Sequence, residues 1–350
     1  MQDWRNNVRS VTPYVPGEQP KSKNIIKLNT NENPYPPSPA VKEALAAMGD
    51  LRLYPDPAAT DLVDAIADYK GLKPENVFVG VGSDDVLAMA FLTFFNSESP
   101  LLFPDITYSF YDVWAELFGI PFERVAVDES FRIRKEDYER QCGGIIFPNP
   151  NAPTGILMET EEIEAILKAH RDAVVIVDEA YIDFGGRSAL DLIHRYDNLL
   201  VVQTFSKSRS LAGLRIGFAM GSPDLIRALS DVKYSFNSYT MNLPSIRLGR
   251  AAIKDEDYFR ETTGRIIRTR EWFKKEMAGL GFTFPDSMAN FVFVTHPEIR
   301  AEDIFRRARE EGIYLRYFNK PRISDYLRIT IGRENEMEAL LDFLKKMVKN

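Results

Sequence analysis

The sequence predicts an α/β protein with a mostly parallel sheet flanked by helices, joined to a smaller α+β domain. Between about residues 76 and 220, short apolar runs without alternation recur, and helical stretches lie between them. Strands buried on both faces have this uniform character, and strand–helix alternation favours parallel pairing. After about Ser222 the pattern changes to a long amphipathic helix, followed by a mixture of short strands and helices.

In the first region the apolar runs predict seven strands. They are expected at residues 77–79, 101–103, 122–127, 145–147, 174–177, 199–204 and 216–220. The stretches between them have helical patterns, expected at residues 84–95, 108–118, 160–169 and 190–195. We therefore expect a large cofactor-binding domain over residues 24–235.

In the second region one apolar stripe predicts a long helix. Apolar residues recur every seven positions, which is the spacing of one helix face, at Phe259, Ile266, Phe273 and Leu280. Further elements follow: a strand at 291–294, a helix at 301–311, strand-like runs at 313–317 and 327–331, and a closing helix. We expect a small domain of residues 236–350, together with an N-terminal arm of residues 1–23.

Composition excludes several classes of protein. Of the 350 residues 45% are hydrophobic, which is ordinary for a globular chain and unlike a disordered one. The net charge of −7 argues against nucleic-acid binding. No apolar run approaches the ~18 residues of a membrane span, and residues 1–7 lack an apolar signal core. The single cysteine, Cys142, suits a reducing compartment, so we expect a cytoplasmic protein that binds neither nucleic acid nor membrane.

Several catalytic designs lack their parts. The three histidines, His170, His194 and His296, are scattered and form no H-E-x-x-H pattern, so no metal site is expected. Neither a G-x-S-x-G elbow nor a G-x-x-x-x-G-K-[ST] loop occurs. The segment Gly80–Asp85 begins like a dinucleotide-binding loop but lacks its third glycine. A phosphate cradle at the start of the following helix remains open.

One lysine follows a predicted strand in a setting that suits covalent chemistry. Lys207 lies between Ser206 and Ser208, just after the run 199–204, and Arg215 follows eight residues later. A lysine flanked by small hydroxyl residues near an arginine suits a Schiff base beside an anion site. A surface lysine in a polar loop is the alternative for this segment taken alone.

Three other polar segments also follow predicted strands. Asp178 ends a buried run and can face a positively charged heterocycle, or merely cap the next segment. The segment Asn149–Gly155 combines prolines with two asparagines and a threonine, and Gly82–Asp85 offers backbone N–H groups at a helix start, or a plain N-cap. Because ligands of open α/β sheets bind beyond the carboxyl ends of the strands, the segments together predict one site.

In this order the segments resemble the pyridoxal-phosphate aminotransferases of fold type I, most closely the histidinol-phosphate aminotransferases. The resemblance extends over nearly the whole chain, through segments at Val11–Tyr14, Leu28–Pro34, Leu53–Asp56, Asp178–Tyr181 and Leu327–Gly332. It implies a pyridoxal 5'-phosphate cofactor. It also implies ping-pong transfer of an amino group, through Schiff bases, between L-histidinol phosphate and 2-oxoglutarate or glutamate in histidine biosynthesis.

The resemblance also implies roles for individual residues. Lys207 would form the Schiff base and move the proton, Asp178 would pair with the pyridine N–H, and Tyr181 would donate to the ring 3-oxygen. Tyr108 would stack on the ring. The cofactor phosphate would be held by residues from several segments: Ser83, Asp84, Thr204, Ser206, Arg215 and, from the partner subunit of a homodimer with a shared site, Tyr54.

One position departs from the family pattern. The usual Asn-Asn-Pro-Thr-Gly segment has Ala152 where the asparagine that bonds the ring 3-oxygen is expected. Either Asn151 replaces that asparagine or Tyr181 has the role alone, and the sequence leaves both open.

Two arginines in the second region suit an anionic substrate. Arg316 and Arg328 lie in strand-like runs, and the resemblance implies that they clamp the substrate phosphate and carboxylate. Tyr14, Asn29 and Asn290 would assist them. An aromatic amino-acid aminotransferase, a threonine-phosphate decarboxylase-like enzyme and a cofactor-binding regulatory module without turnover remain as alternatives.

Overall fold

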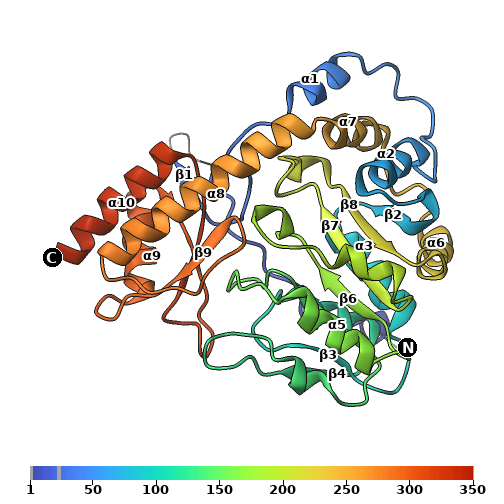
Figure 1. The fold of residues 1–350 in the computed structure, drawn as a ribbon, viewed down its shortest axis with the longest axis horizontal. Helices are drawn as coiled ribbons and strands as arrows, with labels where there is room; N and C mark the ends of the chain where they lie inside the picture. Colours follow the sequence, from blue (N-terminus) through green and yellow to red (C-terminus); the bar gives the residue numbers. More distant parts are fainter. Residues whose placement is uncertain (1–2, 22–24, 350) are drawn as a thin grey trace.

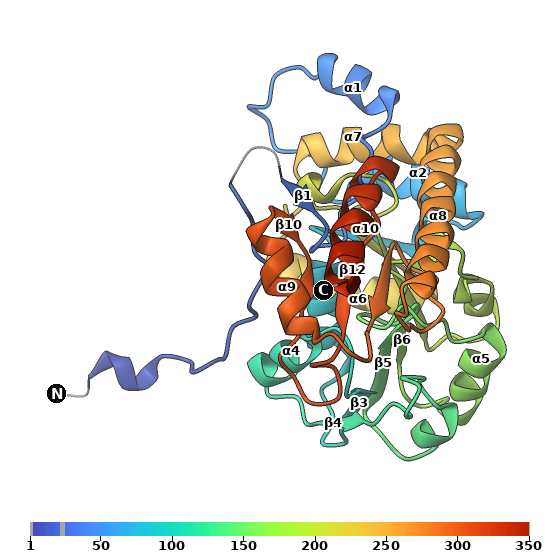
Figure 2. The ribbon, with the colours of Figure 1, turned by 90° about the vertical axis from the view of Figure 1, so that its left-hand side faces the viewer.

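The computed structural model describes residues 3–21 and 25–349. Figure 1 shows a large sheet with helices on both faces and, beside it, a smaller body joined to it by the long helix α8 (Glu256–Gly279). Figure 2 shows the N-terminal part of the described chain, with the 3-10 turn Trp4–Asn7, projecting from the body as an arm, whereas Tyr14 further along the chain already packs on Phe110 of the large body. In the described part of the chain, no helix is both long and apolar enough to cross a membrane.

The large sheet has the strands that the sequence predicts. In spatial order they are β2 (Val77–Gly80), β8 (Gly217–Gly221), β7 (Leu199–Thr204), β6 (Val175–Asp178), β5 (Gly144–Pro148), β3 (Leu101–Pro104) and β4 (Phe122–Val125). Strand β8 is antiparallel to both of its neighbours, and the other pairings are parallel. The mostly parallel sheet is therefore confirmed.

Both faces of this sheet are buried, which explains the lack of alternation in its strands. One face packs against α2 (Thr60–Lys70), α5 (Thr160–Ala169) and α7 (Leu243–Lys254), and α1 (Pro39–Ala46) lies against α7. The other face packs against α3 (Ser83–Phe94), α4 (Phe110–Phe118) and α6 (Pro223–Phe236). In β6, Val175 and Val177 join the first core and Ile176 joins the second.

Two predicted helices differ in detail. The helix expected at 108–118 begins at Phe110, so Tyr108 precedes it in the turn after β3. The stretch expected at 190–195 forms short 3-10 turns over Ala189–His194 rather than an α-helix.

The smaller body contains α8, α9 (Ala301–Glu310) and α10 (Glu334–Lys349), packed on the antiparallel sheet β11–β12–β9. Strands β9 (Phe291–Val294) and β12 (Leu327–Thr330) occur where they are predicted. The run expected at 313–317 splits into β10 (Ile313–Tyr314), which pairs with β1 (Ile26–Lys27), and β11 (Arg316–Tyr317), which pairs with β12. The split sets Arg316 directly opposite Arg328.

The packing favours different domain boundaries from those that the sequence suggests. Helix α7 lies beyond residue 235, yet Ile246 and Leu248 belong to the core of the large sheet. Leu28, in contrast, belongs to the core of the smaller body. The packing therefore favours a boundary between α7 and α8, whereas the boundary expected between residues 23 and 24 lies outside the described residues.

Candidate active site

A cavity of about 180 Å³ lies beyond the carboxyl ends of β6 and β7. The structure brings together around it most of the residues predicted for the cofactor: Ser83, Asp84, Tyr108, Asp178, Tyr181, Thr204, Ser206, Lys207 and Arg215. The remaining lining comes from Thr30, Glu32, Pro148, Ala152, Ala180 and Ala212. Strand ends of one parallel sheet open on the same edge, which is why segments more than a hundred residues apart meet here.

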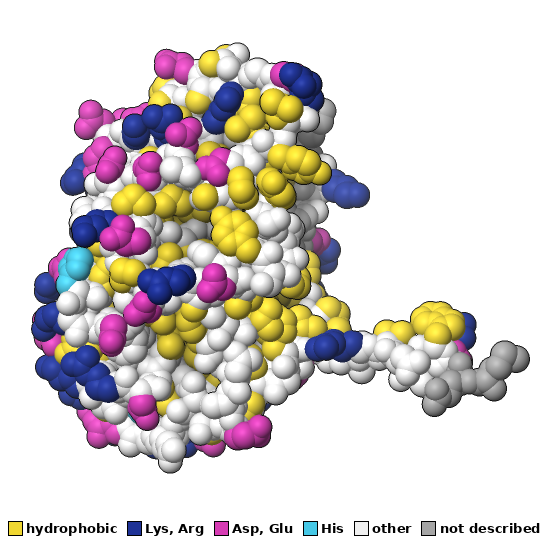
Figure 3. Space-filling view, turned by 90° about the vertical axis from the view of Figure 1, so that its right-hand side faces the viewer, with side chains coloured by type: hydrophobic (Ala, Val, Ile, Leu, Met, Phe, Trp, Pro, Cys, Tyr) yellow, Lys and Arg dark blue, Asp and Glu magenta, His cyan; other side chains and the backbone are white. Residues whose placement is uncertain are grey.

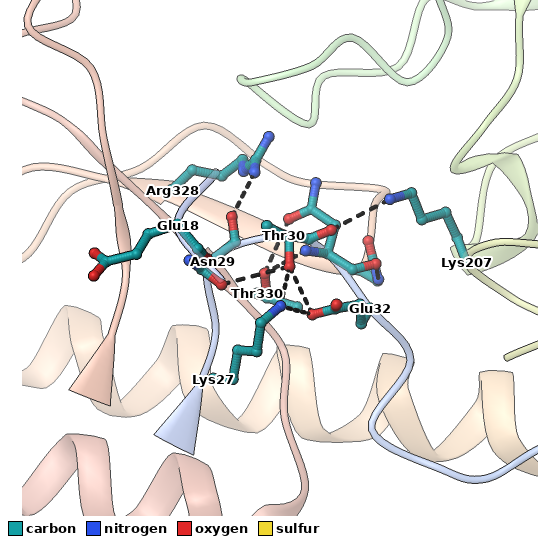
Figure 4. Close-up of polar contacts among 10 residues, drawn as sticks. Glu18, Lys27, Asn29, Thr30, Glu32, Lys207, Arg328 and Thr330 are labelled. Atoms are coloured by element: carbon teal, nitrogen blue, oxygen red, sulfur yellow. Dashed lines mark hydrogen bonds and ion pairs between the residues drawn. The ribbon is translucent and has the colours of Figure 1, made fainter. Parts of the chain in front are cut away.

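The segment that carries Lys207 is held on both sides. Strand β7 ends at Thr204, whose Oγ1 accepts a hydrogen bond from the Ser206 backbone N–H at 3.1 Å. The Lys207 carbonyl accepts from Asn33 Nδ2 at 3.0 Å, and Lys207 Nζ donates to the Thr30 carbonyl at 3.3 Å. Figure 4 shows the lysine side chain reaching toward Thr30. Because Lys207 and Thr30 both line the cavity, this hydrogen bond holds the Lys207 amine at the cavity.

Asp178 ends β6 and is only 5% exposed. Burial raises the pKa of this carboxyl to about 6, against the opposing effect of a hydrogen bond that Tyr111 Oη donates at 2.9 Å. A buried carboxylate whose pKa stays raised despite such a hydrogen bond is further stabilised by a cationic partner. Tyr111 is a contact that the sequence analysis missed, because a tyrosine on the apolar face of α4 has the pattern of a core aromatic.

The start of α3 forms a cradle that suits a phosphate. Gly82 has φ +88°, and a Cβ atom there would lie 2.5 Å from Arg215 Nη2. A Cβ at Gly217 would lie 2.2 Å from the Ser83 backbone nitrogen, so only glycines leave this space open. The first N–H groups of a helix have no intrahelical partner, and together with a guanidinium and hydroxyls they bind phosphate dianions. The residues present therefore fit the phosphate end of pyridoxal phosphate.

Two side chains organise the rim of this cradle. Arg215 Nη2 donates to Asp84 Oδ2 at 3.1 Å, and Tyr108 Oη donates to Asp84 Oδ1 at 2.8 Å. Burial raises the pKa of Tyr108 well above its usual range, with the Asp84 carboxylate adding to the shift. Tyr108 therefore stays neutral and presents an aromatic ring to the cavity.

A second cavity, of about 430 Å³, adjoins the first and shares Tyr108, Tyr181 and Lys207 with it. Four residues predicted for the substrate also line it: Tyr14, Asn29, Arg316 and Arg328. Tyr14 stacks on Phe110 with ring centroids 4.2 Å apart. The structure thus joins the predicted cofactor and substrate residues in one continuous site.

The arginines of the second cavity have no acidic partner. Neither Arg316 nor Arg328 forms an ion pair with a carboxylate in residues 3–21 and 25–349. Arg328 Nη2 donates to the Asn29 carbonyl at 2.9 Å, shown in Figure 4, but its buried Nε has no hydrogen-bond partner in that part of the chain. Burial lowers the pKa of Arg328, and the Arg316 charge adds to this. Two neighbouring cations with a spare buried donor suit an anionic ligand.

Three predicted residues do not reach either cavity. Asn151 is 1% exposed and turns away, with Nδ2 donating to the Ile106 carbonyl at 3.0 Å. Asn290 is fully buried and donates to the Asn31 carbonyl at 2.9 Å. Tyr54 is 82% exposed on the outer surface, 4.7 Å from the Tyr239 ring. Of the two possibilities at the departing position, the geometry disfavours Asn151, whereas the Ala152 side chain lines both cavities.

The comparisons with known proteins agree with this geometry. The family described as aminotransferase class I and II matches residues 23–344. The chain is 52% identical to a histidinol-phosphate aminotransferase of Clostridium botulinum, over 99% of this chain and 98% of that protein. It is 54% identical to one of Pseudomonas putida, over 97% and 99% of the two chains. The crystal structure of histidinol-phosphate aminotransferase from Sinorhizobium meliloti in complex with pyridoxal-5'-phosphate superposes with a TM-score of 0.85 at 25% identity, over 93% of this chain and 91% of that one.

Proposed function

Because the chain belongs to the class I and II aminotransferases, which use pyridoxal phosphate, we propose that it transfers an amino group between L-histidinol phosphate and 2-oxoglutarate or glutamate, a reaction of histidine biosynthesis. The observation that carries the proposal is the pair of arginines that have no acidic partner among the described residues, beside a cavity lined by Lys207 and Asp178. Such a pair suits a substrate that has a phosphate or a carboxylate.

Several residues of the first cavity have a proposed task toward the cofactor. Pyridoxal phosphate supplies, when bound, an aldehyde that condenses with amines and a ring that accepts electrons from the substrate α-carbon. The Asp178 carboxylate would hold a proton on the ring nitrogen, which offsets the cost of burying that carboxylate. Arg215, Thr204, Ser206 and the first turn of α3 would hold the phosphate, and the Tyr108 ring would pack on the pyridine.

The second cavity then orients the amine that reacts. Arg328 and Arg316 would hold the phosphate of one substrate and the carboxylate of the other in turn, with Tyr14 and Asn29 beside them. This would place the substrate α-carbon near Lys207, whose amine would take a proton from that carbon. Tyr108 and Tyr181 line both cavities, and their rings would help to exclude water from the proton transfer.

Competition among amine donors tests this proposal. Purified protein with pyridoxal phosphate is given histidinol phosphate, phenylalanine or threonine phosphate, with 2-oxoglutarate as acceptor. We expect the highest kcat/KM for histidinol phosphate, and a fall of at least about tenfold for histidinol without its phosphate, the loss of one charge-assisted contact. A preference for phenylalanine would instead indicate an aromatic amino-acid aminotransferase, and release of CO₂ from threonine phosphate a decarboxylase.

We also propose a cytoplasmic homodimer whose two active sites are shared. Exposed apolar side chains support this: Leu45, Leu51, Leu53, Tyr54, Tyr234, Phe236 and Tyr239 on the body, and Trp4, Val8, Val11 and Val15 on the arm. Figure 3 shows hydrophobic side chains gathered on one face of the body and on the projecting arm. Exposed patches of this kind mark association surfaces, and a two-fold interface would bring Tyr54 to the partner's phosphate cradle.

Mixing two variants tests the shared site. Tyr54→Ala impairs the phosphate contact supplied to the partner, and Lys207→Ala removes the reacting lysine. A hybrid dimer would contain one site with both residues intact, so activity should rise above the sum of the two variants after subunit exchange. If the subunits exchange without any gain, or if the protein is an active monomer, the shared-site proposal is wrong.

A further inference from the structure

We infer that Asn31 is a positioning residue, whose side-chain amide directs the Tyr181 hydroxyl proton into the active-site cavity. Asn31 lies in the segment Asn29–Glu32, which crosses the site between the two bodies and is called the strap here. The inference rests on the proposed function, because it concerns what the Tyr181 proton meets in the cavity. Neither the local pattern around Asn31 nor the family resemblance implies a role for this residue.

The hydrogen-bond directions around Asn31 follow from which groups can donate. Asn31 Nδ2 donates to Tyr181 Oη at 2.9 Å. Because an amide nitrogen is only a donor, the Tyr181 oxygen accepts this bond and its own proton points elsewhere. Tyr181 lines both cavities, so the open direction for that proton is the site.

Thr330 fixes the orientation of the Asn31 amide. Thr330 Oγ1 accepts from the Asn31 backbone N–H at 3.0 Å and donates to Asn31 Oδ1 at 3.0 Å. This contact holds the amide oxygen toward β12 and the amide nitrogen toward Tyr181. Both Asn31 and Thr330 are almost fully buried, at 1% and 2% exposed, so water does not compete for these bonds.

Two side chains of the smaller body hold the strap by donating hydrogen bonds to its backbone carbonyls. Asn31 has φ +57°, a left-handed conformation that asparagine adopts more readily than most residues. Its carbonyl accepts from Asn290 Nδ2 at 2.9 Å, and two residues earlier the Asn29 carbonyl accepts from Arg328. Figure 4 shows this part of the strap between Arg328 and Lys207. Asn290, predicted to touch substrate, therefore acts on the strap.

The direction of the Tyr181 proton matters because the asparagine of the family pattern is missing from this cavity. Ala152, which has no side-chain donor, lines the cavity at that position, and Asn151 faces away. A phenol proton that points into the cavity stabilises negative charge on an oxygen placed there. Toward the ring oxygen of the bound cofactor, it would stabilise the deprotonated form and hold the cofactor's titration at lower pH.

The Asn31→Asp substitution tests the direction of this hydrogen bond. An aspartate keeps the size, the acceptor for Thr330 and the tolerance for positive φ, but it replaces the donor by an acceptor. Tyr181 would then donate its proton to the new carboxylate, away from the cofactor. We expect the pH midpoint of the visible band of the cofactor-loaded protein to rise by about one pH unit, and by less in Asn31→Ala.

A matched control separates direction from stability. Asn198 is also a buried asparagine, 7% exposed, and it donates to the His170 and Ala173 carbonyls just before β7, at the strand end opposite the site. Asn198→Ala should lower the melting temperature without moving the midpoint. An unmoved midpoint in both Asn31 variants, with the same loss of stability, would show a merely structural role and overturn the inference.

The Asn31→Asp substitution also introduces a negative charge near the site. A Tyr181→Phe background separates the effect of that charge from the effect of the Tyr181 proton. Without the hydroxyl, Asn31→Asp should no longer shift the midpoint, because the shift depends on the Tyr181 proton. A shift of equal size in both backgrounds would be a through-space charge effect and would also overturn the inference. If the wild-type protein gains no visible band with pyridoxal phosphate, the proposed function fails as well. A wild type that titrates normally beside unshifted variants overturns this inference alone.

Discussion

The two cavities of the active site are assembled in different ways. The first is built mainly from strand ends and turns of one sheet, between Ser83 and Arg215. The second combines Tyr14 and the strap with Arg316 and Arg328, some three hundred residues later in the chain. Local patterns predict the strand-end segments that form the first cavity, whereas pairing between distant segments decides the shape of the second.

The two cavities also differ in how their charged side chains are paired. In the first cavity charged side chains already have protein partners, such as Arg215 with Asp84 at 3.1 Å and Asp178 with Tyr111 at 2.9 Å. In the second, two arginines lie opposite each other without an acidic partner in the described part of the chain. Preorganised partners suit a resident group, and unpaired cations suit ligands that come and go. The first cavity is therefore suited to a cofactor and the second to alternating substrates.

The largest expected effect comes from Lys207→Ala. Transamination should be abolished while the fold remains, because one half-buried side chain at a strand end is lost and no core volume changes. The wild type should be yellow and lose its visible band on borohydride reduction, with Lys207 modified. The control is Lys73→Ala, an exposed lysine whose side chain is 78% accessible, which should leave activity unchanged. A colourless, borohydride-inert wild type with saturating cofactor would remove Lys207 from the chemistry.

A smaller effect, a loss of apparent substrate affinity, is expected for the two arginines of the second cavity and should differ between them. Loss of one charge-assisted contact costs about 1.5–3 kcal/mol, or about ten- to a hundredfold in apparent affinity. Arg328→Ala should weaken both histidinol phosphate and glutamate, because one site serves both, and Arg316→Ala should weaken the phosphate substrate more. Steady-state kinetics with each substrate measure this. Unchanged KM values in both variants would mean that neither arginine binds substrate.

The smallest effect on turnover is expected at Glu179, next to Asp178 in sequence but outside both cavities. Glu179 accepts hydrogen bonds from Ser188 Oγ at 2.6 Å, the Ala189 N–H at 2.7 Å and Gln203 Nε2 at 2.7 Å. Glu179→Gln should keep most activity, whereas Asp178→Asn should lose most of it, because only Asp178 lines the site.

The Glu179→Gln substitution should instead change how the free energy of unfolding depends on pH. Burial raises the pKa of the Glu179 carboxyl to about 7, above the usual value near 4.5. Between those values the unfolded chain releases a proton that the folded protein keeps, so this residue's contribution is full below pH 4.5 and is lost as the pH rises toward 7. Urea unfolding of wild type and Glu179→Gln at pH 4.5 and 7.5 should show that part of the pH dependence, about 3 kcal/mol, missing in the variant. Equal pH dependence in both proteins would contradict the assignment.

The fold also has parts that local sequence patterns predict and parts that only the pairing of distant segments decides. Strands such as 199–204 are predictable because burial on both faces requires uniform apolar character. The run 313–317 has the same appearance but divides at Leu315, since its two halves pair with different strands. Tyr111 likewise has the pattern of a core residue, and only the packing of α4 on the large sheet brings its hydroxyl to Asp178.

By itself the sequence determined the class of fold, the catalytic lysine candidate and the strand-end residues around it, because each depends on a few neighbouring residues and on the rule that parallel strands end at one edge. The tertiary structure alone decided that Asn151 turns away, that Asn290 holds the strap, and that Asn31 meets Tyr181. These contacts join residues up to 259 positions apart. Side-chain direction at a buried position is set by which donors and acceptors the neighbouring segments leave open.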